Sequence, residues 1–154
     1  MVFLNIGCGV RKFKNAVNVD IDRNVGPGIV CDCQFLPFQN HSFNFILASH
    51  VIEHNKAHNE IIRELIRVCN GTVRIVVPNY LSQSQFNDET HIRALSFRNF
   101  RSGLGIVPDS YKVRIFPVNT WVKSRCRFIH AIFILLAKID WFLADTLIVE
   151  ILCQ

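Results

Sequence analysis

Short apolar runs alternate with amphipathic segments along most of the chain. The runs are rich in β-branched and aromatic residues and are bounded by turn-forming residues, a pattern that predicts β-strands. We place these strands at residues 2–6, 16–20, 28–31, 43–48, 72–77, 112–118 and 146–152. Strands that alternate with helices favour an α/β fold with a mostly parallel sheet.

The clearest helical pattern covers residues 57–69. Its apolar side chains recur at helical spacing, at Ile61, Ile62, Leu65, Ile66 and Cys69. Charged residues lie mainly on the opposite face, as in a helix packed on a core. Asn70-Gly71 predicts the end of this helix, because glycine commonly takes the left-handed conformation just past a helix. A shorter helix is predicted over residues 96–104.

The first two predicted strands flank a glycine turn. The first strand runs into Gly7-Cys8-Gly9, and the second ends on Asp20. Two parallel strands of this kind place a nucleotide-sized pocket at their carboxyl ends, where a carboxylate can accept hydrogen bonds from a ribose. Lys12 stands where the third glycine of a dinucleotide-binding loop would fall. This argues against NAD or FAD and leaves adenosyl ligands without phosphates.

Composition fits a single domain over residues 1–154. Half of the residues are hydrophobic and 19% are charged, which argues against disorder. The net charge of +5 is typical of a solvated basic surface or of a protein with an acidic partner. Lys and Arg cluster only at residues 123–127, and no nucleic-acid-binding module is spelled out. The N-terminus lacks a signal-peptide pattern and the six cysteines form no C-x-x-C pair, so we expect free thiols and a cytoplasmic location.

Seven short segments stand in a fixed order between residues 4 and 79. They are Leu4-Asn5-Ile6-Gly7-Cys8-Gly9, Val19-Asp20-Ile21, Asp32 ahead of Leu36-Pro37-Phe38, Ser42-Phe43-Asn44-Phe45-Ile46, Ala48-Ser49-His50-Val51-Ile52-Glu53-His54, Glu64-Leu65-Ile66-Arg67-Val68 and Val76-Val77-Pro78-Asn79. Together they resemble class I S-adenosylmethionine-dependent methyltransferases, and more narrowly small predicted methyltransferases with L-N-x-G-C-G and S-H-x-x-E-H. Residues 88–93 are similar to the D-x-T-H-x-R segment of that group.

The resemblance implies a Rossmann-like, seven-stranded sheet with an antiparallel last strand and S-adenosyl-L-methionine as cofactor. It implies that Asp20 holds the ribose, that Asp32 meets the adenine amino group, and that Ser49 and His50 border the methionine end. The implied cofactor site comprises Asn5, Gly7, Cys8, Gly9, Asp20, Ile21, Asp32, Cys33, Ser49 and His50.

The segment after the first strand departs from this family. Gly7 and Asp20 are thirteen positions apart, which leaves no room for the full first helix of typical class I enzymes. Residues 11–15 can form about one helical turn. The usual N-terminal cap helix is also absent from the pattern. We therefore expect an open donor site that is weaker, or that a dimer partner or the acceptor closes.

Two histidines are candidates for catalysis. His50 follows the fourth strand, and His91 follows the fifth, at the sheet edge where ligands bind in open α/β folds. His50 could belong to the donor or the acceptor pocket, and His91 could act as a general base, because histidine has an ordinary pKa of about 6.5. His50 to His54 also match H-x-x-E-H, an inverted zinc-protease pattern. That pattern lies at a strand-to-helix junction, so we predict no metal at His50 and His54; a structural role for His54 stays open.

Residues 128–144 form a long apolar segment. Lys138 and Asp140 interrupt a run that is already shorter than the ~20 residues of a bilayer span. We expect a helix that packs on the core or on a second subunit, which would make a homodimer. The alternative is peripheral membrane contact, with the basic residues 123–127 at the headgroups.

These features predict a methyltransferase that acts on an oxygen or nitrogen. Residues 79–93 offer many hydrogen-bonding side chains, two acids and, before Arg93, no Lys or Arg. Such a loop favours a small-molecule or glycan-type acceptor and argues against nucleic acid. The alternative is a degenerate methyltransferase fold that serves as a non-catalytic binding or membrane-surface module. The short first loop favours that alternative, whereas Asp20 and Asp32 argue against it.

Overall fold

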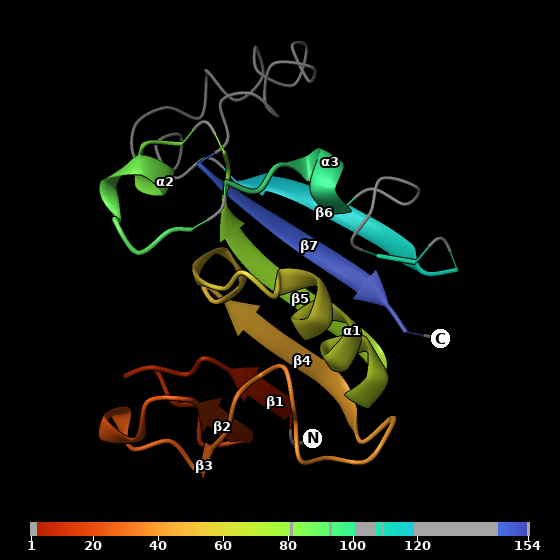
Figure 1. Ribbon diagram of the computed structural model, residues 1–154. Helices are drawn as coiled ribbons and strands as arrows, with labels where there is room; N and C mark the ends of the chain where they lie inside the picture. The colour runs from red at the N-terminus through yellow and green to blue at the C-terminus, as the bar shows by residue number, and fades with distance from the viewer. Residues whose placement is uncertain are drawn as a thin grey trace, which may run out of the picture.

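The computed structural model describes residues 3–80, 82–92, 94–100, 107–108, 110–118 and 145–153. They form a seven-stranded sheet in the order β3-β2-β1-β4-β5-β7-β6 (Figure 1). The strands are β1 (Phe3–Ile6), β2 (Ala16–Asp20), β3 (Ile29–Val30), β4 (Phe43–Ser49), β5 (Cys69–Pro78), β6 (Lys112–Val118) and β7 (Thr146–Leu152). Neighbouring strands in the run β3-β2-β1-β4-β5 pair in parallel, and β7 is antiparallel to β5 and β6. The predicted α/β sheet with an antiparallel last strand is confirmed.

Helix α1 (His58–Val68) lies over β4 and β5 (Figure 1). Its residues Ile61, Ile62 and Leu65 are fully buried and join the strand side chains in one core. Burying each such side chain stabilises the fold by about 1.5–3 kcal/mol. The residue before the helix, Ala57, makes no side-chain cap, so apolar packing rather than capping holds α1 in place.

The remaining helical elements are short. They are η1 (Arg23–Val25), η2 (Ile52–His54), α2 (Gln83–Asn87) and α3 (Phe97–Phe100). Helix α3 lies within the predicted helix 96–104, of which residues 101–104 fall outside the described part of the chain.

The C-terminal end of α1 differs from the prediction, because the chain passes directly from the helix into β5. Cys69 is extended, with φ −90° and ψ 140°, and begins β5, so Gly71 lies inside the strand rather than in a left-handed cap. A Cβ on Gly71 would come within 2.2 Å of the carbonyl oxygen of Asn44 on β4. The β4–β5 register also shifts between Phe43 and Phe45. Gly71 is therefore required by a close approach of two strands, not by the end of a helix.

No helix separates β1 from β2, as their spacing predicts, and residues 7–15 form turns instead. Two asparagines hold this loop. The Asn5 amide donates to the carbonyl of Arg11 at 3.1 Å and to the side-chain oxygen of Asn18 at 3.0 Å. Asn18 in turn pairs with both backbone groups of Phe13. These side-chain hydrogen bonds fix the conformation of the loop, which has no helix to fix it.

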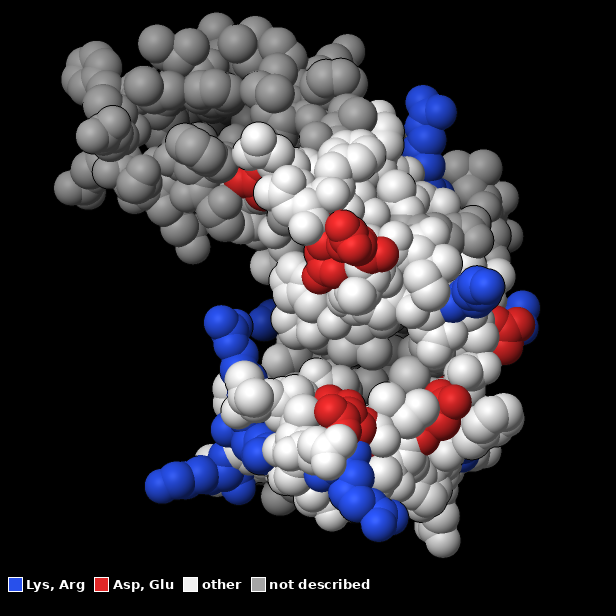
Figure 2. All heavy atoms as spheres, turned by 60° about the vertical axis from the view of Figure 1, so that its left-hand side comes forward, with Lys and Arg blue, Asp and Glu red and all other residues white. Residues whose placement is uncertain are grey.

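Basic side chains gather over the β1–β3 end of the molecule, at the bottom of Figure 2. Arg11, Lys12 and Lys14 come from the β1–β2 loop and Arg23 from η1, and all four are exposed. Positive charge is thus concentrated around the short first loop: Arg11, Lys12 and Lys14 are neighbours in the sequence, and the fold adds Arg23 (Figure 2).

Several sequence predictions fall outside the described residues. They include the apolar segment 128–144 and the basic cluster 123–127, so the homodimer and the membrane contact stay predictions. Within the described part, no helix is long and apolar enough to cross a membrane. The described cysteines, Cys8, Cys31, Cys33, Cys69 and Cys153, are free thiols, as predicted.

Candidate functional site

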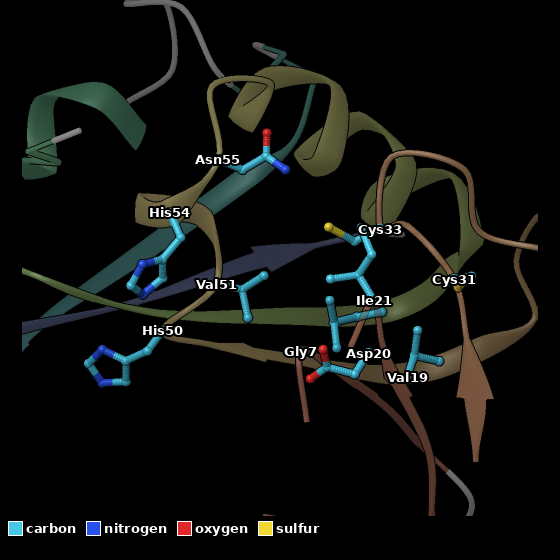
Figure 3. A pocket seen from close by; sticks show the side chains of 11 residues that line it. Gly7, Val19, Asp20, Ile21, Cys31, Cys33, His50, Val51, His54 and Asn55 are labelled. Atoms are coloured by element: carbon cyan, nitrogen blue, oxygen red, sulfur yellow. The ribbon is translucent and has the colours of Figure 1, made fainter. Parts of the chain in front are cut away.

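A pocket of about 290 Å³ opens at the carboxyl ends of β1, β2 and β4. The strand order reverses between β1 and β4, which is where open α/β sheets bind ligands. Asp20, Ile21 and Cys33 lie toward one end of the pocket, and His50 and His54 lie at the other (Figure 3). The lining residues are Ile6, Gly7, Val19, Asp20, Ile21, Cys31, Cys33, His50, Val51, His54 and Asn55.

The glycine turn forms the floor of this pocket. Gly7 and Gly9 have φ values of +58° and +48°, in the left-handed region that favours glycine. A Cβ on Gly7 would lie 2.4 Å from a methyl carbon of Val51, another lining residue. The Cys8 amide donates to the Val19 carbonyl at 3.0 Å, which extends the β1–β2 ladder beneath the pocket. Glycine at residue 7 thus allows Val51 to pack directly against the turn.

Asp20 is fixed by two backbone amides. Its Oδ2 accepts from Gly9 at 2.8 Å and its Oδ1 from Asp22 at 3.0 Å. An ionised carboxylate offers about four acceptor positions, so each oxygen keeps capacity for a ligand hydroxyl. Asp22 differs, because its own Oδ1 caps η1 through the Asn24 amide at 2.8 Å. The pocket therefore presents one oriented carboxylate of the kind that binds a diol.

Two cysteines form the wall beside Asp20. Burial, with a smaller effect of the nearby Asp32 carboxylate, raises the pKa of Cys33 to about 11 and also raises the pKa of Cys31. Both thiols are thus neutral at pH 7 and give the wall an apolar character suited to an adenine ring. Asp32 lies between them in sequence but does not line the pocket. Its Oδ1 accepts from the Gln34 amide at 2.9 Å.

His50 stands at the opposite end with a buried carboxylate behind it. Its backbone has φ +55°, and its amide donates to the Val76 carbonyl at 2.9 Å. Its Nδ1 lies 3.1 Å from Oε1 of Glu53, whose side chain is fully buried while that of His50 is 51% exposed. An ionised carboxylate can only accept, so it holds the proton on Nδ1 and leaves Nε2 as the acceptor. This is the arrangement of an oriented general base.

The structure brings five predicted site residues together. Gly7, Asp20, Ile21, Cys33 and His50 all line the pocket. The predicted residues that do not line it are Asn5, Cys8, Gly9, Asp32, Ser49 and His91. Asn5 instead holds the β1–β2 loop, and Gly9 positions Asp20. His91 lies beside His54, with ring centroids 4.7 Å apart, and is nearly buried.

Sequence reasoning missed six lining residues: Ile6, Val19, Cys31, Val51, His54 and Asn55. Most of them stand at the carboxyl ends of β1, β2 and β4 or in the turn after β4. The rule that ligands bind at the point of strand-order reversal would have found the turn after β4, once β1 and β4 were taken as neighbours.

Comparison with known proteins agrees with this geometry. The model of a family described as a methyltransferase domain matches residues 4–77. That range contains the glycine turn, Asp20 and the turn after β4. No curated protein matches the chain significantly. The resemblance seen in the sequence is confirmed to this extent: residues 4–77 match the model of a methyltransferase domain.

Solved structures show the same fold at low sequence identity. A SAM-dependent methyltransferase from Archaeoglobus fulgidus is 16% identical, with a TM-score of 0.68, and the match covers 98% of this chain and 85% of that one. A putative methyltransferase in complex with the Haloferax volcanii Trm112 methyltransferase activator is 12% identical, with a TM-score of 0.65 and coverage of 99% and 82%. The Haemonchus contortus phosphoethanolamine N-methyltransferase 2, in complex with S-adenosyl-L-methionine, is 12% identical, with a TM-score of 0.62 and coverage of 99% and 47%. The described sheet thus has the fold of class I S-adenosylmethionine-dependent methyltransferases, for which S-adenosyl-L-methionine is the cofactor.

Proposed function

We propose that this chain is a methyltransferase that uses S-adenosyl-L-methionine to methylate an oxygen or nitrogen of a small-molecule or glycan-type acceptor. The observation that carries the proposal is the Asp20 carboxylate. It is held at the end of β2 by the Gly9 and Asp22 amides and faces a pocket at the strand-order reversal. A ribose with two adjacent hydroxyls fits the acceptor positions that remain on this carboxylate.

The rest of the pocket suggests how the donor would lie. In this proposal the ribose sits on Asp20, and the adenine extends along Ile21 and Cys33 toward Asp32. The methionine portion runs over Gly7 toward His50. The two neutral thiols favour the apolar ring, and the absence of a Cβ on Gly7 lets the Val51 side chain pack against the glycine turn under the chain of the ligand.

His50 is our proposed general base. When bound, the donor supplies an electrophilic methyl group on a positively charged sulfur, so alignment of the acceptor provides most of the rate. The new bond forms between the acceptor atom and the methyl carbon as the carbon–sulfur bond breaks and its electrons stay on sulfur. The acceptor proton passes to Nε2 of His50, whose orientation Glu53 fixes through Nδ1. His91, the other predicted base, does not line the pocket.

The polar loop of residues 79–93, which we expect to contact the acceptor, supports a polar, uncharged substrate. Of the predicted polar loop, Gln83, Asn87, Asp88 and Glu89 are exposed, whereas Asn79 and Gln85 are buried. Two exposed carboxylates repel a phosphate backbone, and amide and carboxylate groups suit hydroxyl-rich ligands.

The non-catalytic alternative draws on one specific observation. Val10, Ile21 and Phe35 are 87%, 69% and 76% exposed at the β1–β3 end, where a typical first helix is missing. An uncovered donor site of this kind would bind the donor weakly, as an interaction module could.

A methyl-transfer assay decides between these functions. Donor with a labelled methyl group is incubated with glycans, small hydroxylated or amino metabolites, lipids, proteins and duplex nucleic acids. We expect label in a glycan or small-molecule fraction, loss of labelling in Asp20→Ala and retention in the control Asp22→Ala. Labelling of duplex DNA or RNA would refute the acceptor class, and the absence of any transfer would favour the non-catalytic module.

A further inference from the structure

Three potential metal ligands meet beside the donor pocket. Glu53 and His54 belong to η2, and His91 follows α2. One ligand atom from each lies within 4.8 Å of the others. The loop after α2, which carries His91, is held against η2 by a hydrogen bond: the Ile92 amide donates to the Glu53 carbonyl at 3.0 Å. The cluster therefore results from the fold, since His91 is remote from the other two in sequence.

The hydrogen bonds of both histidines are made at Nδ1, and this leaves Nε2 as the atom that can bind a cation; Nε2 of His91 lies 3.7 Å from Oδ2 of Asp88. Nδ1 of His91 lies 3.0 Å from the Gln85 carbonyl, which can only accept, so the proton is on Nδ1. Nδ1 of His54 lies 2.9 Å from the Thr90 hydroxyl, which donates its proton to the Asp88 carboxylate. That hydroxyl must accept from His54, so Nδ1 of His54 also carries the proton. Metal-binding histidines are oriented by outer hydrogen bonds of this kind.

The Glu53 carboxylate gives independent support for a cation site. Its side chain is fully buried, and Oε2 has no hydrogen-bond partner among the described residues. Oε1 faces only Nδ1 of the half-exposed His50. A buried, half-satisfied carboxylate is costly unless a positive charge lies next to it. The cluster of imidazole nitrogens beside Glu53 is where such a charge would sit.

We propose that Glu53, His54 and His91 bind a Zn²⁺ ion. Two imidazoles and one carboxylate form a ligand set that leaves the fourth position of zinc open. Ligand atoms of a tetrahedral zinc are about 3.3 Å apart, given zinc–ligand distances of about 2.0–2.1 Å. Binding would require side-chain rotations that bring the ligand atoms from within 4.8 Å of one another to that distance. The site leaves out His50 and adds His91, and for His54 it reverses the prediction from sequence that no metal binds there.

The test is a zinc titration of tag-free, full-length protein freed of metal by chelation. Zn²⁺ alone is titrated against a competing chromogenic chelator, and Co²⁺ is used in parallel for its visible absorption. We expect one ion per chain in the parent. Glu53→Gln and His91→Ala should weaken binding by about 100-fold or more, since even outer partners of metal ligands are worth about 10- to 100-fold. Thr90→Val, which removes only the hydroxyl beside His54, should weaken it by about 10-fold.

His41→Asn is the matched control, because His41 pairs with the Cys69 carbonyl and lies outside the cluster. It should bind zinc as the parent does. Failure of the parent to bind one Zn²⁺, or binding that survives unchanged in Glu53→Gln and Thr90→Val, would overturn the proposal. Neither result depends on donor binding, so the site is tested apart from the proposed function.

Discussion

Glu64 joins helix α1 to the loop that follows Asp32, and replacing it tests how this wall of the site is held. Its Oε1 accepts from the Leu36 amide at 2.9 Å and from Arg67 at 2.6 Å. Arg67 also donates to the carbonyls of Leu36 and Phe38. Glu64→Gln keeps the size of the side chain and its bond from the Leu36 amide but removes the charge. Hydrogen bonds to charged groups contribute about 1.5–3 kcal/mol, so we expect a loss of about 2 kcal/mol in the free energy of unfolding at pH 7.

The loss should depend on pH with a defined sign. The hydrogen bond from Arg67 holds the pKa of Glu64 below its ordinary value, against the opposite effect of partial burial. A carboxyl whose pKa is lowered by folding stabilises the protein above its unfolded pKa of about 4.3. That stabilisation disappears as the pH falls through the lower, folded pKa. The difference between parent and Glu64→Gln should therefore be constant from pH 7 to about 5 and shrink below about pH 4.

Urea unfolding over a pH series measures this difference. Glu60→Gln on the same helix is the control, because Glu60 and Arg63 are 3.9 Å apart and both more than half exposed. Exposed ion pairs contribute about 0–1 kcal/mol, so Glu60→Gln should change little. A cost for Glu64→Gln no greater than for Glu60→Gln, or one that does not vary between pH 7 and pH 3, would refute the reasoning.

Two glycine substitutions give further predictions. Gly71→Ala should lower the free energy of unfolding by about 2–3 kcal/mol in urea titrations, because its Cβ meets the fixed carbonyl of Asn44; an unchanged midpoint would contradict the strand contact. Gly7→Ala should weaken donor binding and stability, since its Cβ meets Val51 at a positive φ. Adding Val51→Ala should restore part of the stability in thermal melts, leaving a residual cost of about 1–2 kcal/mol for the left-handed backbone; no recovery would mean that the clash is not the cause.

The strands could be predicted well because each carries its own local pattern. β2, β6 and β7 begin and end where the pattern predicts, and β4 differs by one residue. Gly71 could not be interpreted from sequence, because its role depends on the backbone of Asn44 in a neighbouring strand. A local rule for helix ends gave the wrong reason for a residue that a tertiary contact requires.

The residues of the site also fall into those that a local motif predicts and those that only the folded chain brings together. Gly7 and Asp20 belong to a short motif with its own chemistry, and both line the pocket. His54 and His91 come from separate segments, and their meeting depends on the path of the loop after β5. Asn5 shows the reverse case, because its position in a motif implied a donor contact while its amide holds the β1–β2 loop. Short-range motifs indicate the ligand class, and long-range packing decides which side chains assemble.

Direct donor binding tests the central claim. Isothermal titration of the parent with S-adenosyl-L-methionine and with its demethylated product should show saturable binding at one site. Asp20→Ala should weaken it by about 10- to 100-fold, as loss of a charged hydrogen bond predicts, and Asp22→Ala should weaken it less. No binding by the parent, or equal affinity in the parent and Asp20→Ala, would contradict the account.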